Sequence, residues 1–326
     1  MTRLPELDGR RVSVEVPATS ANLGAGYDVL AVALEMPLRV EVEAMARPGA
    51  GVELTVEGEG AGELAADRSN GFVVALERAL ADARGPGAAD GLGWRIRMTN
   101  RIPLSRGLGS SAAATVAGLL AGHALVAGSP DAGPAPDDLL AVAAELEGHP
   151  DNAAAAILGG FTVAIGGDEP GSPPVALRFD PPRDLRAVLF VPEQRLSTRE
   201  MRAVLPDRVP LADAVANLGR VAVGVAGLAA GRADLLRLLT VDRLHEPYRA
   251  AAFPALPRLV AAARAAGALG ACLSGAGSTV VAFVDSLAAI TRIEAAFAAA
   301  AADLDLAGRV QLVALQAHGG RVLAVD

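Results

Sequence analysis

A glycine- and serine-rich stretch decides the fold of this chain: Ile102-Pro103-Leu104-Ser105-Arg106-Gly107-Leu108-Gly109-Ser110-Ser111-Ala112-Ala113-Ala114. It follows an alternating apolar run at residues 94–98, which predicts a strand, and it opens into the Ala- and Leu-rich residues 115–126, which predict a helix. Glycines let a backbone approach an anion closely, and the first N–H groups of a helix lack intrahelical partners while the helix dipole favours negative charge there. Strand, glycine loop and helix N-terminus together predict a phosphate-binding loop.

A glycine turn whose serines merely cap a helix would look similar, so from the residues alone both interpretations stay open. The stretch fits neither G-x-x-x-x-G-K-[ST] nor G-x-G-x-x-G, which excludes the P-loop and Rossmann fingerprints. Arg106 adds a charged donor to the loop, and the adjacent hydroxyls of Ser110 and Ser111 are candidate metal ligands.

The composition bounds the remaining possibilities. Hydrophobic residues make up 52% of the 326 residues but aromatic ones only 3%, so we expect a core of Ala, Val and Leu. The net charge of −8 argues against nucleic acid or an anionic membrane as the main partner. The beginning of the chain lacks the apolar core of a signal peptide, and no apolar run free of Gly, Pro and charge approaches membrane-spanning length. With the single cysteine, Cys272, these features predict a cytoplasmic protein.

The basic residues restrict the chemistry that is available. All 29 of them are Arg, and Lys does not occur in the sequence. A lysine-assisted base, a Schiff base and a P-loop lysine are therefore excluded.

Two further segments gather polar side chains. Residues 12–16 alternate and predict a strand, and the small residues of 17–28 break that pattern. The latter stretch carries Asn22 and Asp28, which either cap a loop or form a pocket wall with an amide and a carboxylate. Residues 145–152 crowd carboxylates, an imidazole and an amide together, and they predict either a capped helix end or a Mg²⁺ site, because Mg²⁺ prefers one or two carboxylates plus phosphate oxygens. The polar residues of this second segment are Glu145, Glu147, His149, Asp151 and Asn152.

Taken together, the motifs resemble those of the GHMP kinases. Residues 103–113 are similar to that family's loop P-x-x-x-G-L-G-S-S-A-A, and residues 17–28 to its motif P-x-x-x-x-N-L-G-x-G-[FY]-D. Residues 274–279 are similar to S-G-A-G-P-[ST], except that Ser278 replaces the proline and thereby loosens φ. The three motifs occur in order, so the resemblance spans nearly the whole chain.

Other strings resemble, within the family, the members that phosphorylate L-homoserine. They are Ser20-Ala21-Asn22-Leu23-Gly24, Glu147-Gly148-His149-Pro150-Asp151-Asn152, Ser197-Thr198 with Arg202, His245-Glu246-Pro247-Tyr248-Arg249, and Ser274-Gly275-Ala276-Gly277. The chain departs from the pattern at residues 153–156, where four alanines replace Val-Ala-Pro-Ala. By itself, Ser197 with Glu200 also predicts a capping box at a helix start.

The resemblance implies a two-domain α+β fold. An N-terminal α+β domain, residues 1–170, would hold the nucleotide loop, and a C-terminal ferredoxin-like α+β domain would comprise residues 171–326. The proline- and glycine-rich residues 168–182, which show little periodicity, are where we expect the boundary.

The resemblance also assigns the donor and metal sites. Residues Pro103 to Ala113 would bind ATP. Ser111 with Glu147 would hold Mg²⁺, and Glu145 is the alternative carboxylate.

The acceptor, a small-molecule substrate, is assigned in the same way. Its carboxylate would be bound by Arg202 and Arg249 and its ammonium group by Asp28, and the residues that orient the rest would be Asn22, His149, Asn152 and Thr198. In that comparison the catalytic group comprises Asn22, Asp28, Asn152, Thr198 and Arg202. We interpret His245 as a structural residue.

The proton acceptor and the identity of the substrate stay open at this stage. GHMP relatives are usually described with an Asp base aided by a Lys, which this chain lacks, so Asp28 or Asp151 acts alone or the proton passes to the phosphate without a protein base. We favour the last option.

The expected reaction is ATP-dependent phosphorylation of the L-homoserine hydroxyl in threonine biosynthesis. The alternatives are another GHMP kinase, of the mevalonate-pathway type, and a non-catalytic ATP- or amino-acid-binding regulator. A homodimer is compatible with the sequence, which does not fix the oligomeric state.

Overall fold

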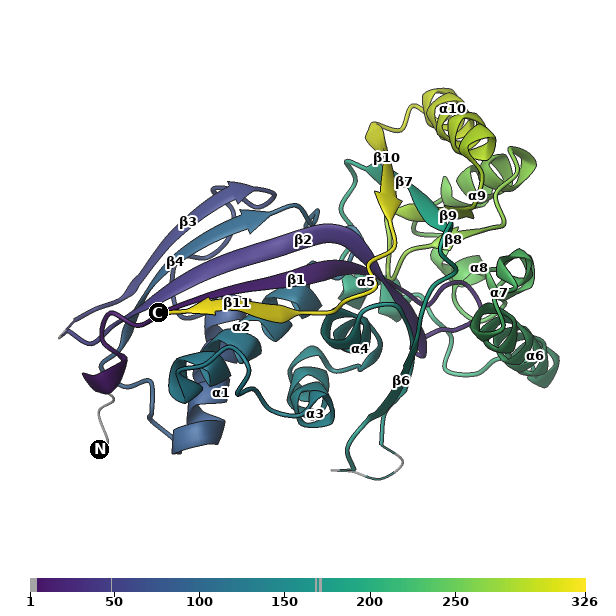
Figure 1. Ribbon diagram of the computed structural model, residues 1–326. Coiled ribbons are helices and arrows are strands. Elements are labelled where there is room, and N and C mark those ends of the chain that lie inside the picture. The colour runs from purple at the N-terminus through teal and green to yellow at the C-terminus, as the bar shows by residue number, and fades with distance from the viewer. Residues whose placement is uncertain (1–4, 48, 168, 170–171) are drawn as a thin grey trace.

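A long antiparallel hairpin, formed by β1 and β2, runs through the structure and carries elements of both halves of the chain (Figure 1). The computed structural model describes residues 5–47, 49–167, 169 and 172–326. The strands are β1 (Arg11–Ala21), β2 (Leu30–Met45), β3 (Val52–Gly58), β4 (Gly93–Asn100), β5 (Phe161–Ile165), β6 (Val175–Phe179), β7 (Arg186–Pro192), β8 (Gly270–Leu273), β9 (Val280–Val284), β10 (Gly308–Ala314) and β11 (Arg321–Val325).

Helices connect these strands and cover the sheets. The α-helices are α1 (Gly71–Arg84), α2 (Ser110–Ala127), α3 (Pro136–Glu147), α4 (Asp151–Leu158), α5 (Thr198–Ala203), α6 (Leu211–Ala229), α7 (Leu236–Leu239), α8 (Glu246–Arg249), α9 (Leu256–Ala265) and α10 (Leu287–Asp303). Two short 3₁₀ helices, η1 (Pro5–Leu7) and η2 (Ala233–Leu235), complete the described elements.

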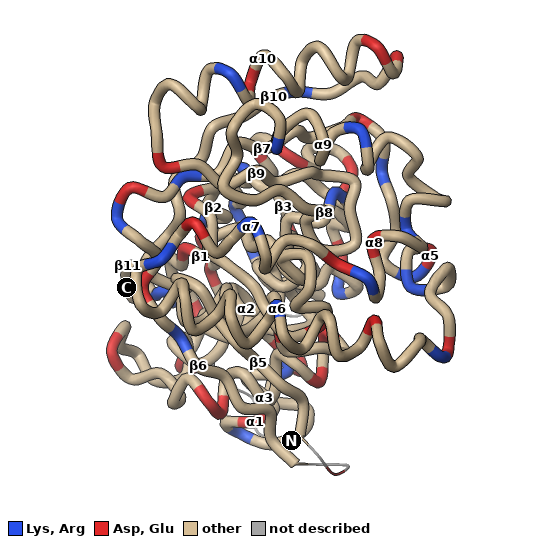
Figure 2. Tube along the Cα trace, turned by 90° about the vertical axis from the view of Figure 1, so that its right-hand side faces the viewer, with Lys and Arg blue, Asp and Glu red and all other residues tan. Residues whose placement is uncertain are grey.

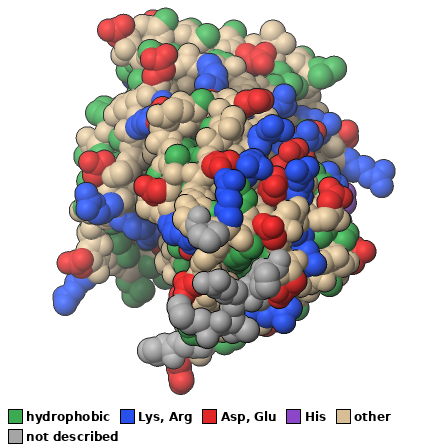
Figure 3. All heavy atoms as spheres, turned by 90° about the vertical axis from the view of Figure 1, so that its left-hand side faces the viewer, with side chains coloured by type: hydrophobic (Ala, Val, Ile, Leu, Met, Phe, Trp, Pro, Cys, Tyr) green, Lys and Arg blue, Asp and Glu red, His purple; other side chains and the backbone are tan. Residues whose placement is uncertain are grey.

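The first sheet has the strand order β11-β1-β2-β4-β3, and β5 and β6 continue it from the other end of β2. Its strands pair antiparallel except β3 and β4, which are parallel. Helices α1 to α4 cover one face (Figure 1). The opposite face carries charged side chains in pairs, such as Glu15 with Arg39 and Arg321. Positive and negative side chains are also interspersed on the side of the molecule shown in Figure 3.

Strand β1 is longer than the sequence predicted. The alternation at residues 12–16 predicted a strand that ends before Pro17, but pairing with β2 continues to Ala21. The register shifts between Pro17 and Ala18, and such a bulge accommodates a proline that cannot donate to the ladder. The extension matters because it brings the loop that follows β1 to the centre of the molecule.

The second sheet has the order β10-β7-β9-β8 and is antiparallel throughout. Numbered along the chain from β7, this is the order 4-1-3-2, with α9 between the first and second strands and α10 between the third and fourth. Both helices pack on the sheet through apolar residues such as Leu259 and Phe297. The ferredoxin-like arrangement expected for the C-terminal half is therefore confirmed.

The strand pairing does not follow a single domain boundary along the chain. Residues 170 and 171, where the boundary was predicted, lie outside the described residues. Beyond them, β6 pairs with β5 and β11 pairs with β1, so both strands belong to the first sheet. The division into residues 1–170 and 171–326 stays a prediction.

Two of the described helices, α2 and α6, are long and apolar enough to cross a membrane by length and composition alone. In α2, 61% of the apolar window is buried, and Gly118 and Gly122 lie so close to α1 that an added Cβ would meet the carbonyl oxygens of Phe72 and Leu76 at 2.3 and 2.6 Å. This is a core helix. In α6 only 22% of the corresponding apolar stretch is buried. Figure 2 shows this helix, which has few charged residues, crossing one side of the molecule.

Candidate active site

A cavity of about 550 Å³ lies where the phosphate-binding loop meets the loops that follow β1, α3 and β8. It is large enough for a nucleotide and a small molecule, since ligand pockets span about 300–1,000 Å³. Every residue predicted for the site lines it except Ala113, which is fully buried within the core, and Glu145, the alternative metal ligand. Residues from distant parts of the chain are thus brought together as expected.

The predicted phosphate loop connects β4 to α2. Ser105, Gly107 and Gly109 adopt positive φ angles of 56°, 73° and 70°. The helix starts without a side-chain cap, and its Ala113 N–H donates to the Gly109 carbonyl at 2.9 Å. The N–H groups that precede Ala113 are the orphan donors of a helix N-terminus, and the residues that carry them line the cavity. This is the geometry that binds an anion.

The two glycines of the loop are also required by their neighbours. A Cβ at Gly107 would lie 2.0 Å from the carbonyl oxygen of Ser274, and one at Gly109 would lie 1.9 Å from Oγ1 of Thr19. The Ser274 hydroxyl donates to the Gly107 carbonyl at 2.7 Å. The phosphate loop is therefore packed directly against the third motif.

Arg106 lies in the loop that was predicted to bind phosphate, but its side-chain donors contact backbone carbonyls. Its Nε and Nη2 donate to the carbonyls of Pro192 and Glu193, both at 2.8 Å, and its Nη1 donates to the Leu104 carbonyl at 2.7 Å. The side chain lines the cavity, but its donors tie the loop to the end of β7. Its position favours a structural role over direct phosphate binding.

A carboxylate and two hydroxyls meet at the start of α2. Oε1 of Glu147 accepts from the Ser111 hydroxyl at 3.0 Å and from the Thr115 hydroxyl at 2.6 Å. Thr115 was not predicted, although it follows Ser111 by one helical turn and therefore lies on the same helix face. Glu145, the alternative ligand, forms a two-pronged ion pair with Arg78 on α1 and does not line the cavity.

Among the described residues, no group of three His, Cys, Asp or Glu side chains could hold a metal ion. Mg²⁺ does not need one, because it is bound by one or two carboxylates and takes its other ligands from water and phosphate. Glu147 and Ser111 both line the cavity beside the helix N-terminus, so this donor set fits Mg²⁺.

The start of α4 presents His149, Asp151 and Asn152 to the same cavity. Nδ1 of His149 lies 2.7 Å from Oδ1 of Asp151, which also accepts from the Asn152 N–H at 2.7 Å. The hydrogen bond to Asp151 raises the pKa of His149 above its usual value. Oδ1 of Asn152 accepts from the Thr19 hydroxyl at 2.7 Å, which fixes the orientation of the amide.

The loop after β1 is held by Asn22. Its φ is 71°, its Nδ2 donates to the Gly275 carbonyl at 2.8 Å, and its Oδ1 accepts from the Asp28 N–H at 3.0 Å. Both polar atoms of Asn22 are thus used within the protein. This residue shapes the loop and connects it to the third motif.

Complementary charges gather at the far end of the cavity. Asp28 forms a two-pronged ion pair with Arg202 on α5, and the Tyr27 hydroxyl accepts from Nη1 of the same arginine at 2.8 Å. Arg249, which is 1% exposed, lies with its Cζ 5.3 Å from the Tyr27 ring centroid. Tyr27 was not predicted as a site residue, although it occupies the [FY] position of the motif at residues 17–28. Thr198 lines the cavity at the start of α5.

A helix N-terminus ready for phosphate, a carboxylate–hydroxyl pair suited to Mg²⁺ and an adjoining charged pocket define a phosphotransferase site. Comparison with known proteins agrees with this geometry. Residues 71–160 match the family GHMP kinases N terminal domain, and residues 225–303 match GHMP kinases C terminal. The chain belongs to the GHMP kinase family.

Within the family, similar proteins are homoserine kinases. The homoserine kinase of Moorella thermoacetica is 42% identical over 83% of this chain and 86% of its own length. That of Symbiobacterium thermophilum is 47% identical over 74% of each chain. The crystal structure of homoserine kinase from Cytophaga hutchinsonii has a TM-score of 0.82 at 30% identity, covering 96% of this chain and 97% of that one.

Proposed function

We propose that this protein transfers the γ-phosphoryl group of ATP to the side-chain hydroxyl of L-homoserine, in threonine biosynthesis. The observation that carries the proposal is the set of charges at one end of the cavity that the phosphate loop also lines. Asp28, Arg202 and Arg249 line one end of the cavity, and they match the ammonium and carboxylate groups of an amino acid. The products are O-phospho-L-homoserine and ADP.

The donor end of the cavity binds the nucleotide. The N-terminal N–H groups of α2 stabilise the β- and γ-phosphates, and Glu147 with Ser111 hold Mg²⁺, which neutralises phosphate charge when it is bound. Beyond the phosphate loop the cavity continues along Leu64, Ser69 and Asn70, where we place the nucleoside. No sequence motif had indicated that these three residues line the cavity.

The acceptor end orients the hydroxyl. Arg202 and Arg249 bind the carboxylate, since a planar guanidinium matches a carboxylate with two parallel hydrogen bonds. Asp28 binds the ammonium group. The side chains of His149, Asn152 and Thr198 line the cavity between this end and the phosphate loop, and we assign them to the hydroxyl end of the substrate. Positioning of this kind supplies much of the catalysis in phosphoryl transfer.

Both carboxylates that were considered as a base already accept hydrogen bonds within the protein. Both oxygens of Asp28 accept from Arg202, and Oδ1 of Asp151 accepts from the Asn152 N–H beside His149. These contacts support the option that the hydroxyl proton passes to the transferred phosphoryl group. The absence of Lys from the sequence points the same way.

An assay of ADP release with Mg-ATP tests the proposal, with L-homoserine, mevalonate and L-threonine offered side by side. Turnover with homoserine alone is expected. Turnover with mevalonate, which has no ammonium group, would overturn the acceptor assignment and leave the phosphate site intact. Tight ATP binding without turnover of any acceptor would favour the non-catalytic regulator.

The cellular context is part of the proposal. We place the protein in the cytoplasm, where ATP is supplied and where the buried thiol of Cys272 stays reduced. Burial raises the pKa of that thiol, which keeps it protonated and unreactive. The net charge of −8 supports the expectation that neither nucleic acid nor an anionic membrane is a partner.

The homodimer also stays a prediction, and α6 is the surface on which we place it. Its exposed face carries large residues at Leu211, Val215 and Leu218 and small ones further on at Ala222 and Ala226. Two copies packed antiparallel would set large residues against small ones. Light scattering of the wild type and of the L218E variant tests this. A dimer is expected for the wild type and a monomer for L218E, and the same mass for both would exclude this surface.

A further inference from the structure

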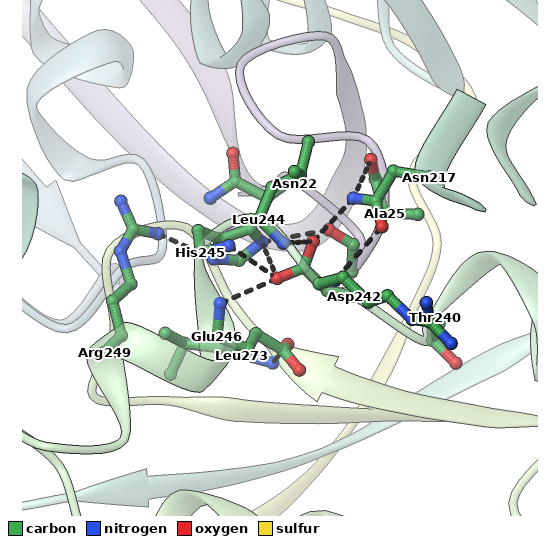
Figure 4. Close-up of polar contacts among 12 residues, drawn as sticks. Asn22, Ala25, Asn217, Thr240, Asp242, Leu244, His245, Glu246, Arg249 and Leu273 are labelled. Carbon is green, nitrogen blue, oxygen red and sulfur yellow. Dashed lines mark hydrogen bonds and ion pairs between the residues drawn. The ribbon is translucent and has the colours of Figure 1, made fainter. Parts of the chain in front are cut away.

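A buried polar cluster lies behind the acceptor end of the cavity (Figure 4). At its centre, the fully buried carboxylate of Asp242 accepts from Nδ2 of Asn217 at 2.7 Å. It also accepts from the N–H groups of Leu244, His245 and Glu246 at 3.0, 2.7 and 2.7 Å. One carboxylate therefore fixes the backbone at the start of α8.

The partners of His245 determine which of its nitrogens carries the proton. Nε2 lies 2.9 Å from the Gly24 carbonyl, which can only accept, so Nε2 is the donor. Nδ1 lies 3.1 Å from Nη1 of Arg249, which can only donate, so Nδ1 is the acceptor. A neutral ring satisfies both contacts. Burial, together with the nearby Arg249, lowers the pKa of His245 to about 4, against the attraction of Asp242.

Arg249 is held on several sides. Its Nη1 also donates to the Gly275 carbonyl at 3.0 Å, and its Nε donates to the Met201 carbonyl at 3.2 Å. Within the described part of the chain, these contacts and the one to His245 leave Nη2 without an acceptor at hydrogen-bond distance. Because Arg249 lines the cavity, Nη2 is the donor left for a ligand.

We propose that His245 is a positioning residue for the acceptor site. Its Nδ1 holds Arg249 in the orientation that offers Nη2 to the substrate carboxylate, whereas the Nε2 contact with Gly24 supports the loop and does not position the arginine. The inference rests on the proposed function, because it takes Arg249 as a carboxylate ligand. A buried arginine fixed in advance loses less conformational entropy on binding than a free one, which is why the contact contributes to affinity.

Two substitutions separate the two hydrogen bonds of the ring. In H245N, Oδ1 takes the place of Nδ1 and can accept from Arg249, while the contact to Gly24 is lost. In H245Q, the amide nitrogen takes the place of Nε2 and can donate to Gly24, while the acceptor for Arg249 is lost. H318Q, at an exposed histidine away from the cavity, is the matched control.

Steady-state kinetics give the decisive comparison. We expect H245Q to raise KM for homoserine about tenfold, with kcat and KM for ATP within about threefold, whereas H245N and H318Q stay near wild type. The ratio of kcat/KM for homoserine to kcat/KM for 3-amino-1-propanol, which lacks the carboxylate, should fall in H245Q alone. If H245N and H245Q lose kcat/KM equally for both substrates and lose thermal stability equally, the proposal is overturned. His245 would then only support the structure in general.

Crystal structures of H245Q and H245N give a readout that does not depend on turnover. Displacement of the Arg249 guanidinium in H245Q and its retention in H245N are expected, and an unmoved Arg249 in H245Q overturns the proposal. Wild-type protein that fails to phosphorylate homoserine would instead refute the proposed function. The two failures are therefore distinguishable.

Discussion

Asp28 and Arg202 form a two-pronged ion pair, with both oxygen–nitrogen distances at 2.8 Å. Their side chains are 33% and 36% exposed, so the pair borders the cavity and is accessible to a ligand. An amino acid carries the same two charges. Its ammonium group can take the place of Arg202 beside Asp28, and its carboxylate can take the place of Asp28 beside Arg202. Binding would then exchange one internal ion pair for two contacts with the substrate, which favours a zwitterion over an acid that lacks the ammonium group.

Replacing Asp28 by Asn tests the ammonium contact. Loss of a charge-assisted hydrogen bond should raise KM for homoserine by about tenfold to a hundredfold. We expect kcat to fall by less than about a thousandfold, because the proposed mechanism does not use Asp28 as a base. D151N is measured in parallel. A larger loss of kcat at unchanged KM in either variant would identify that carboxylate as a true base.

The metal site can be tested with two neighbouring glutamates. E147Q removes the carboxylate that contacts Ser111 and Thr115, and we expect kcat to fall on the order of a hundredfold, with a higher Mg²⁺ requirement. E145Q, which breaks only the exposed pair with Arg78, should keep wild-type activity. Mg²⁺ titrations of both variants check this, and equal Mg²⁺ dependence of the two would contradict the assignment.

Gly107 is expected to tolerate no side chain. In G107A the new Cβ would strike the Ser274 carbonyl at a φ of 73°, so the free energy of unfolding should fall by about 2 kcal/mol or more. Gly133, around which an added Cβ meets nothing within 4 Å, provides the control substitution G133A. Denaturant unfolding of both variants is the measurement. Equal stabilities would show that the phosphate loop is not packed as described.

His245 should make stability depend on pH. Its pKa is about 4 in the folded protein and near 6.5 when unfolded, so the stability that its neutral form contributes is complete above about pH 6.5 and is lost as the pH falls towards 4. Buried Glu246, whose pKa burial raises to about 8, acts in the opposite direction, with stability lost as the pH rises. Subtracting the H245Q profile from the wild-type profile isolates the histidine. A flat difference between pH 4 and 6.5 would refute the assignment.

Local patterns in the sequence predicted local structure well. The alternation of apolar residues located β4, and apolar residues at helical spacing over residues 70–83 predicted the helix that the structure shows as α1, with Asn70 as its N-cap. Contacts made across long stretches of chain left no such signal. The tethering of Arg106 by carbonyls at the end of β7, and the pairing of β11 with β1, depend on segments that lie far apart in the chain. The motif residues were identified by resemblance, while the roles of Tyr27 and Thr115 needed the structure.

The pairing of β11 with β1 has a consequence for biosynthesis. Among the described strands, β1 is the first to leave the ribosome and β11 the last, yet they are neighbours in one sheet. The whole second sheet is inserted between them in the chain. An edge of the first sheet therefore stays unpaired until β11 has been synthesised, and during that time its exposed backbone groups are open to other chains.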